Sequence, residues 1–221
     1  MVLKESQMVI KESENAIKES QMVIESQMII KKDYFCCFCA VGRKENRYSR
    51  ELISYYMSIG VDKFVFTDNN LPNTEKFSDV LQDYIKNGTV DIIEMIGSGK
   101  GHSELFGIMY DKYQNQCNWL TFFDFDEYLV LFSEDGKNLA LKEYLSNQKF
   151  NNCEAIGFNW VNYGDNDLLY YDNRSSIERF TKPNFNDDTN RFVKSIIRGH
   201  LNKEVYSWKN KSSTNWRCKI M

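Results

Sequence analysis

The strongest constraint on the fold is an alternation of apolar runs and helical patterns between residues 34 and 123. Continuous apolar runs predict strands that are buried on both faces. Between them, apolar residues recur three and four positions apart, as on one face of a helix. This order predicts a mostly parallel sheet with helices on both faces. The predicted strands are 34–41, 63–67, 90–96 and 119–123, and the predicted helices are 47–59, 74–86 and 102–116.

The alternation weakens after residue 128. A short helix is predicted at 139–145, and a polar loop at 184–190. Residues 155–161, 176–180 and 191–198 predict further strands or sheet edges. The fold class predicted from the whole pattern is α/β, with a Rossmann-like, mostly parallel sheet and a mixed C-terminal region.

Polar clusters follow each of the first four predicted strands. In open α/β sheets, ligands bind beyond the carboxyl ends of the strands. We therefore expect one site at that edge, where four segments meet: 44–46 after the first strand, 68–70 after the second, the glycine loop 97–101 after the third and the acids 124–127 after the fourth.

The fourth cluster is Phe123-Asp124-Phe125-Asp126-Glu127, at the end of an aromatic strand. A buried carboxylate is costly unless it is paired or binds a cation. Oxygen ligands suit Mg²⁺ or Mn²⁺, which offsets the charge that develops on a diphosphate leaving group. Asp-x-Asp at a strand end is the pattern that many nucleotide-sugar transferases use for this ion. Unless the chain bends, we expect one aspartate to bind metal directly and the other to act through water or a ribose. Glu127 either orients a ligand or faces solvent.

The ordered series of motifs resembles glycosyltransferase family 92 over residues 34–198. The series includes Glu45-Asn46 in the first loop, Asp68-Asn69, Asp124-Phe125-Asp126-Glu127, Asn159-Trp160 and Lys194-Ser195-Ile196. The resemblance implies a GT-A fold and a nucleotide-sugar donor, UDP-linked, with Mn²⁺ or Mg²⁺ as the cofactor. Characterised relatives transfer galactose with inversion. The function it implies is metal-dependent transfer of a hexose to a glycan acceptor.

The resemblance also assigns roles to residues. Asp124 and Asp126 match the metal motif, and Asp124 also borders the donor. Asp68 matches the acid that contacts the nucleoside, although Asp-Asn-Asn also favours a plain turn. Glu45 lies in the loop expected to border the donor base, although an acid near a helix start is also favoured by the helix dipole.

Two residues near the glycine loop are further donor candidates. Lys100 is placed to approach a phosphate, although its loop matches neither a P-loop nor a dinucleotide fingerprint. His102, at the start of a predicted helix, is either a cap or surface residue or a donor contact.

An inverting transfer requires a general base for the acceptor hydroxyl. Asp165 is our first candidate, ahead of Asp167 and Glu178, and for each of them the alternative is an acid in a turn. Trp160 and Tyr163 could stack on a sugar face, or Trp160 could pack in the core.

Residues 1–32 form a low-complexity, heptad-like repeat. A coiled-coil seam needs apolar residues at both position a and position d of each heptad. Here the apolar residues are contiguous, so when the isoleucines occupy position a, polar residues fall at position d. We interpret it as an appendage that could self-associate. The GT-A domain is then 33–221, with a donor half at about 33–130 and an acceptor half at about 131–221.

Composition limits the partners and the compartment. The net charge is -3 and no basic tract favours nucleic acid. No uncharged apolar stretch is long enough for a transmembrane helix. The six cysteines are interpreted as packed free thiols, with a Cys36/Cys39 zinc or redox pair as the alternative. Free thiols favour a reducing compartment, so the prediction is the cytoplasm, with peripheral membrane contact left open.

Two other functions compete with glycosyl transfer. A phosphohydrolase would use Asp124 as a nucleophile, but that class needs the motif after the first strand and a Thr or Val where this chain has Tyr128. The other is an inactive, truncated remnant that binds nucleotide-sugar or self-associates, because the Asn-Pro-His segment usual in the family is missing.

Overall fold

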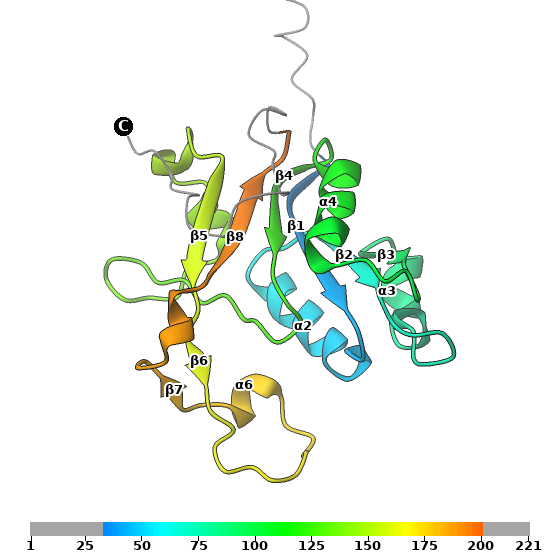
Figure 1. The fold of residues 1–221 in the computed structure, drawn as a ribbon. Helices are drawn as coiled ribbons and strands as arrows, with labels where there is room; N and C mark the ends of the chain where they lie inside the picture. The colour runs from blue at the N-terminus through cyan, green and yellow to red at the C-terminus, as the bar shows by residue number, and fades with distance from the viewer. Residues whose placement is uncertain (1–32, 201–221) are drawn as a thin grey trace, which may run out of the picture. The chain divides into compact units, whose positions relative to one another are not determined.

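A computed structural model of the chain describes residues 33–200, and its centre is a six-stranded sheet (Figure 1). The sheet order is β3-β2-β1-β4-β8-β5. β1 to β4 are mutually parallel, β8 is antiparallel to β4, and β5 is antiparallel to β8. The strands are β1 (Tyr34–Gly42), β2 (Lys63–Asp68), β3 (Val90–Glu94), β4 (Cys117–Phe122), β5 (Ala155–Asn159) and β8 (Val193–Arg198).

Helices cover both faces of this sheet, as the alternation predicted. Alternate side chains of β1 divide between the two faces: Phe38 packs with the residues of α2, and Cys39 with those of α4. This double burial explains why β1 is a continuous apolar run. The helices are α2 (Asn46–Ser58), α3 (Gln82–Lys86), α4 (His102–Tyr113), α5 (Leu141–Leu145) and α6 (Ser176–Arg179), with 3₁₀ turns η1 (Phe77–Asp79), η2 (Gln148–Phe150) and η3 (Asp188–Arg191).

Two sequence predictions of local structure are wrong. The helix predicted at 74–86 is the 3₁₀ turn η1 followed by the short α3, because the backbone N–H of Phe77 donates to Asp68 Oδ2 (3.1 Å) and holds this segment against β2. The strand predicted at 176–180 is the helix α6. Its start is a capping box in which Ser175 and Glu178 each bond the other's backbone N–H.

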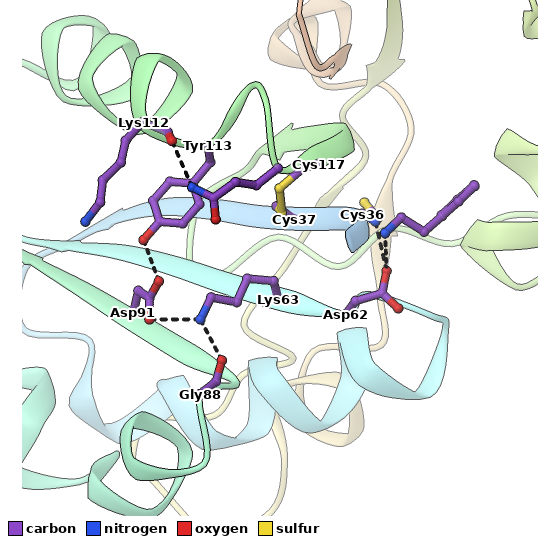
Figure 2. The surroundings of a disulfide bond; sticks show 11 residues. Cys36, Cys37, Asp62, Lys63, Gly88, Asp91, Lys112, Tyr113 and Cys117 are labelled. Carbon is purple, nitrogen blue, oxygen red and sulfur yellow. Dashed lines mark hydrogen bonds and ion pairs between the residues drawn. A yellow bond between two sulfur atoms is a disulfide. The ribbon is translucent and has the colours of Figure 1, made fainter. Parts of the chain in front are cut away.

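The prediction of packed free thiols is wrong for Cys37 and Cys117, which form a disulfide between β1 and β4 (Figure 2). Their Cα atoms are 6.0 Å apart. The sequence could not show this pair because its two members are 80 positions apart and meet only when β1 and β4 become neighbours. Cys36 and Cys39 are free and buried, and they face opposite sides of the sheet, so they do not form a zinc or redox pair.

A polar network around the buried Lys63 lies close to the disulfide (Figure 2). The ammonium of Lys63 donates to the carbonyl of Gly88 (2.6 Å) and pairs with Asp91 Oδ1 (2.8 Å). The hydroxyl of Tyr113 donates to Asp91 Oδ2 (2.5 Å). Burial opposes ionisation of Asp91, but the hydrogen bonds from Lys63 and Tyr113 lower its pKa. The network therefore joins β2, β3 and α4 through one satisfied charge pair.

The polypeptide between β5 and β8 forms an arm beside the carboxyl ends of the parallel strands (Figure 1). It contains the two-stranded sheet β6 (Asn162–Tyr163) and β7 (Pro183–Asn184), together with α6 and η3. Within residues 33–200, none of the helices combines the length and the apolarity needed to cross a membrane. The predicted repeat at 1–32 lies outside the described residues.

Candidate functional site

The ends of the parallel strands lie at one edge, so their polar loops are neighbours. Gly42 at the end of β1 is in register with Asp68 at the end of β2, and Asp68 with Glu94 at the end of β3. The side chain of Asn70 joins two of the loops, because its Oδ1 accepts from Lys44 N (2.8 Å) and its Nδ2 donates to Asp68 Oδ1 (2.8 Å).

The acid loop, residues 124–127, follows β4 and turns directly after the strand. Phe123 and Phe125 are both buried. The backbone turns at Asp124, whose carbonyl accepts from Glu127 N (3.3 Å), while Glu127 Oε2 accepts from Asp124 N (2.9 Å). Asp126 at the tip of the loop is exposed. The aromatic side chains thus anchor the loop, and the turn sets where the carboxylates of Asp124 and Asp126 lie.

Lys194 on β8 is the counter-ion of this loop. Its Nζ lies 2.5 Å from Asp124 Oδ2 and 3.2 Å from Glu127 Oε1. The other oxygen of Asp124, Oδ1, is buried and has no hydrogen-bond partner among the described residues. Burial raises the pKa of Glu127 to about 7, although Lys194 and the Asp124 N–H oppose the shift.

Glu45 faces the acid loop from the start of α2. Its pKa is raised by burial and then by the charges of Asp126, Glu75 and Asp124. Glu75 Oε1 in turn accepts from the backbone N–H of Asn46 (3.3 Å). Carboxylates from three loops therefore share one region, which we call the acid cluster: Glu45, Glu75, Asp124, Asp126 and Glu127.

The acid cluster has the chemistry of a divalent-cation site that is completed by other ligands. Within residues 33–200, no three His, Cys, Asp or Glu side chains converge tightly enough to hold a metal alone. Mg²⁺ and similar ions are usually bound by one or two carboxylates together with water and substrate phosphates. The unpaired, buried Oδ1 of Asp124 and the raised pKa of Glu45 both fit such an ion.

The sequence model of glycosyltransferase family 92 matches residues 32–217, well over half of the chain. The chain belongs to glycosyltransferase family 92. The resemblance inferred from the motifs is confirmed, and so are the α/β class and the GT-A-like arrangement of a mostly parallel sheet between helices. The chain is a glycosyltransferase, which uses a donor and an acceptor substrate. No curated protein matches it.

Asp68 of this family 92 chain lies at the predicted edge, but both of its oxygens are engaged. Oδ1 accepts from the backbone and side chain of Asn70, and Oδ2 accepts from the backbone of Phe77. Asp68 also lines a cavity of about 460 Å³ against the edge strand β3, and no residue of the acid cluster lines that cavity. The contact of Asp68 with a nucleoside remains a prediction. What the structure shows is that Asp68 holds the loop after β2 through these hydrogen bonds.

The glycine loop places Lys100 and His102 outside the acid cluster. Gly97 and Gly99 both have positive φ (65° and 69°), which permits the tight path of the loop. Lys100 pairs with Glu104 one helical turn further on. The rings of His102 and Phe106 form a T-shaped pair, with their centroids 6.1 Å apart. Contacts of either residue with a donor remain predictions.

The candidate bases all lie in turns or caps of the arm. Asp165 is exposed, and its Oδ1 accepts from the backbone of Asp167 (3.0 Å). Asp167 pairs with Lys182 (3.3 Å), and Glu178 caps its own helix. The structure does not bring Asp165 into the acid cluster, so its catalytic role remains a prediction.

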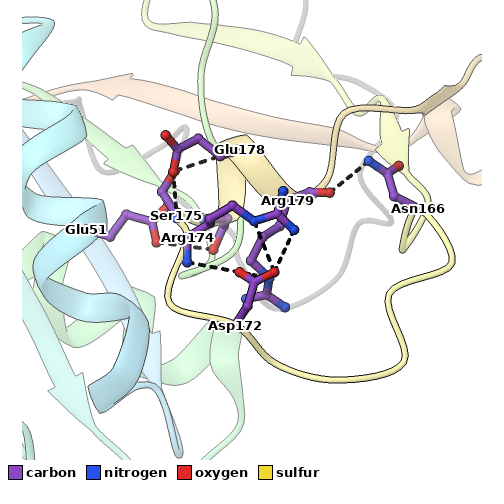
Figure 3. Close-up of polar contacts among 8 residues, drawn as sticks. Glu51, Asn166, Asp172, Arg174, Ser175, Glu178 and Arg179 are labelled. Atoms are coloured by element: carbon purple, nitrogen blue, oxygen red, sulfur yellow. Dashed lines mark hydrogen bonds and ion pairs between the residues drawn. The ribbon is translucent and has the colours of Figure 1, made fainter.

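The arm is fastened to α2 by a carboxylate. Glu51 Oε1 accepts from the backbone N–H of Ser176 (2.7 Å), at the start of α6, and Glu51 Oε2 accepts from the hydroxyl of the same residue (3.3 Å) (Figure 3). The guanidinium of Arg47, also on α2, lies 4.1 Å from the ring centroid of Tyr171. These contacts place the arm beside α2, whose N-cap residue is Glu45.

Sequence reasoning missed the functional interest of Lys194 and Glu75. In the sequence, Lys194 is only one member of the family series. The sequence predicts a strand or sheet edge at 191–198 but not the strands that pair with it. The position of Lys194 follows from the antiparallel register, because Ser195 pairs with Phe122, the last residue of β4, and Lys194 precedes Ser195 on β8 and so lies beyond the end of β4, beside the acid loop. No local signal in the sequence indicates that pairing.

Proposed function

We propose that this glycosyltransferase is metal-dependent and moves a hexose from a UDP-sugar to a glycan acceptor. The observation that carries the proposal is the acid cluster at the carboxyl edge of the sheet, where Asp124 Oδ1 is buried and unpaired and the charges of Asp126 and Asp124 help to raise the pKa of Glu45. Galactose is the proposed hexose because of the family resemblance.

Asp124 and Asp126 would hold Mn²⁺ or Mg²⁺. When bound, the ion supplies positive charge that offsets the charge developing on the leaving diphosphate. Asp124 is suited to the direct contact because its Oδ1 is buried and unpaired and the turn fixes its backbone. Asp126, at the exposed tip, is suited to reach the ion or the donor ribose through water. Glu45 borders both acids and would contact the donor.

Asp165 is the proposed general base, and Asp68 and Lys100 are the proposed further contacts to the donor. Asp165 sits on the arm with an exposed carboxylate, as an acceptor hydroxyl would require. Lys100 lies in a loop whose backbone is free to approach a phosphate. The role of Asp68 rests on the resemblance, and those of Asp165 and Lys100 rest on their places in loops after predicted strands.

The test is a panel of UDP-sugars incubated with Mn²⁺ and candidate glycans, with UDP release and product formation followed together. We expect UDP-galactose to give the fastest turnover, and EDTA to abolish it. Asp126→Asn should lower the rate by at least 100-fold, an effect typical of losing one transition-state contact. Asp111→Asn, an exposed acid on α4, is the matched control and should leave the rate unchanged.

Two outcomes would contradict the proposal. Turnover that is indifferent to EDTA and to Asp126→Asn would exclude the metal. Mn²⁺-dependent UDP binding without turnover on any donor would instead favour the inactive remnant. Asp165→Asn, compared with Asp167→Asn, tests the base separately, because only the loss of the true base should flatten the acidic limb of the pH profile.

A further inference from the structure

Lys194 is held where a metal ion would be expected to act. Its side chain is 18% exposed, and its ammonium contacts both Asp124 and Glu127. Among residues 33–200, no other Lys, Arg or His lies within ion-pair distance of the acid cluster. The ammonium of Lys194 therefore partly neutralises the same carboxylates that a divalent ion would neutralise.

The position of this ammonium is set by rigid structure. β8 is hydrogen-bonded on both sides, to β4 and to β5, and Lys194 lies opposite Phe158 in that register. The ammonium also lies 5.4 Å from the ring centroid of Trp160, which is packed against Phe192. The central strand and the aromatic platform limit how far the charge can move from Asp124.

Electrostatics gives this arrangement a consequence for metal binding. Two cations that share one carboxylate repel each other, and each reduces the negative potential that attracts the other. A nucleotide diphosphate would restore negative charge to the same region. The ammonium of Lys194 would then pair with the diphosphate and compete less for Asp124, so a metal ion should bind better together with the donor than alone.

We propose that Lys194 is a tethered counter-ion that weakens metal binding in the absence of donor and so couples the metal to the nucleotide-sugar. The inference rests on the metal-dependent function proposed above. Because coupling between two ligands is reciprocal, Mn²⁺ should raise the affinity for UDP by the same factor by which UDP raises the affinity for Mn²⁺. Lys194 is a positioning residue in this scheme, since it acts on the ion through Asp124.

The experiment measures Mn²⁺ binding directly, by calorimetry or by the electron paramagnetic resonance of free Mn²⁺, with and without UDP. The variants are Lys194→Met, which keeps an apolar stem against Trp160, and Lys194→Arg, which keeps the charge. We expect Lys194→Met to bind Mn²⁺ alone about tenfold more tightly, because a unit charge near a divalent ion has about this effect even with the screening of water. The ratio of Mn²⁺ affinities with and without UDP should fall by the same factor, and Lys194→Arg should resemble the wild type.

The outcomes separate this inference from the function on which it rests. If the wild type binds Mn²⁺ with UDP, loses that binding in Asp126→Asn, and yet Lys194→Met binds Mn²⁺ equally or more weakly, Lys194 is not a competing counter-ion and only this inference fails. If the wild type binds no Mn²⁺ with or without UDP, both proposals fail. Lys194→Gln serves as a second neutral variant, and melting temperatures confirm that each variant is folded.

Discussion

The ring of Phe125 stacks on the ring of Phe77, with the centroids 5.0 Å apart and 15° between the planes. The pair joins the acid loop after β4 to the turn η1 that follows β2. Both rings lie against Gly42, where a Cβ atom would come 2.2 Å from Phe77 Cζ and 2.8 Å from Phe125 Cε2. The absence of a side chain at the end of β1 is thus what allows the acid loop to be anchored there.

Gly42→Ala should therefore displace the stacked pair and disturb the acid loop. Overpacking of this kind typically costs about 1–3 kcal/mol, and urea unfolding would measure it. Gly107→Ala is the control, since nothing lies within 4 Å of a Cβ at that position in α4. The control should be neutral or stabilising by up to about 1 kcal/mol, because alanine favours a helix over glycine. Equal stability of Gly42→Ala and wild type would show that the rings yield freely.

Glu127 should make the metal-free protein more stable as the pH falls from about 7 toward 4.5. Burial raises its pKa from 4.5 to about 7 in the folded protein, so in this window the folded state holds more protons than the unfolded state. The free energy of unfolding must then decrease as the pH rises, by at most about 3 kcal/mol for this group. Urea unfolding at pH 5, 6, 7 and 8 would measure the slope.

Glu127→Gln isolates this contribution, because an amide cannot titrate and its oxygen can still accept from Asp124 N. The difference in unfolding free energy between wild type and variant should favour the wild type more at pH 5 than at pH 8. A difference that is constant over the range would show that Glu127 titrates normally. Glu45, whose pKa is also raised, contributes to both proteins and cancels in the comparison.

The Cys37–Cys117 disulfide should be present in the purified protein and should stabilise it. It closes a loop of 80 residues, for which the chain-entropy estimate is about 4.5 kcal/mol. Peptide mapping without reductant should recover the linked pair, and Cys37→Ala/Cys117→Ala should unfold at lower urea. Alkylation of both thiols in denaturant without reductant would contradict the pairing. Because disulfides persist in oxidising compartments, a positive result would argue against the cytoplasm, which was predicted on the basis of free thiols.

Much of the donor half could be predicted because its signals are local. β1, β2 and β4 are mostly apolar, and they differ from the predicted strands by two residues or fewer at each end. The polar loops after the strands then had to share an edge, because parallel strands end together. The helix predicted at 74–86 failed since the residues around Phe77 follow a tertiary restraint, the hydrogen bond from Phe77 N to Asp68, and no periodicity records it.

The remaining features depend on pairings between distant segments. Lys194 meets Asp124 across 70 positions, and this contact exists only because β8 inserts between β4 and β5. The arm illustrates the same limit, because Glu51 and Ser176 are 125 positions apart. A resemblance can name such residues as members of a series, but the contacts that give them roles come from the fold.

Glu51→Ala should loosen the arm without unfolding the protein. It removes the acceptor of the Ser176 N–H and hydroxyl, and hydrogen bonds to a charged group are worth about 1.5–3 kcal/mol. The internal contacts of the arm stay in place, because Asn166 Nδ2 donates to the carbonyl of Arg179 (2.8 Å) and to Thr181 Oγ1 (2.7 Å). We therefore expect faster amide exchange and proteolysis within residues 165–180, with the exchange of β1 and β4 unchanged.

The matched control for Glu51→Ala is Glu143→Ala, an exposed acid on α5. It should leave both exchange and proteolysis as in the wild type. Faster exchange in β1 and β4 of Glu51→Ala would mean that the fastening supports the whole domain, and unchanged exchange at 165–180 would mean that Arg47 and Tyr171 alone hold the arm. If the arm receives the acceptor as its place beside α2 suggests, Glu51→Ala should also raise the KM for the acceptor while the KM for the donor stays the same. That difference is expected because Glu51 hydrogen-bonds the arm and is not a member of the acid cluster.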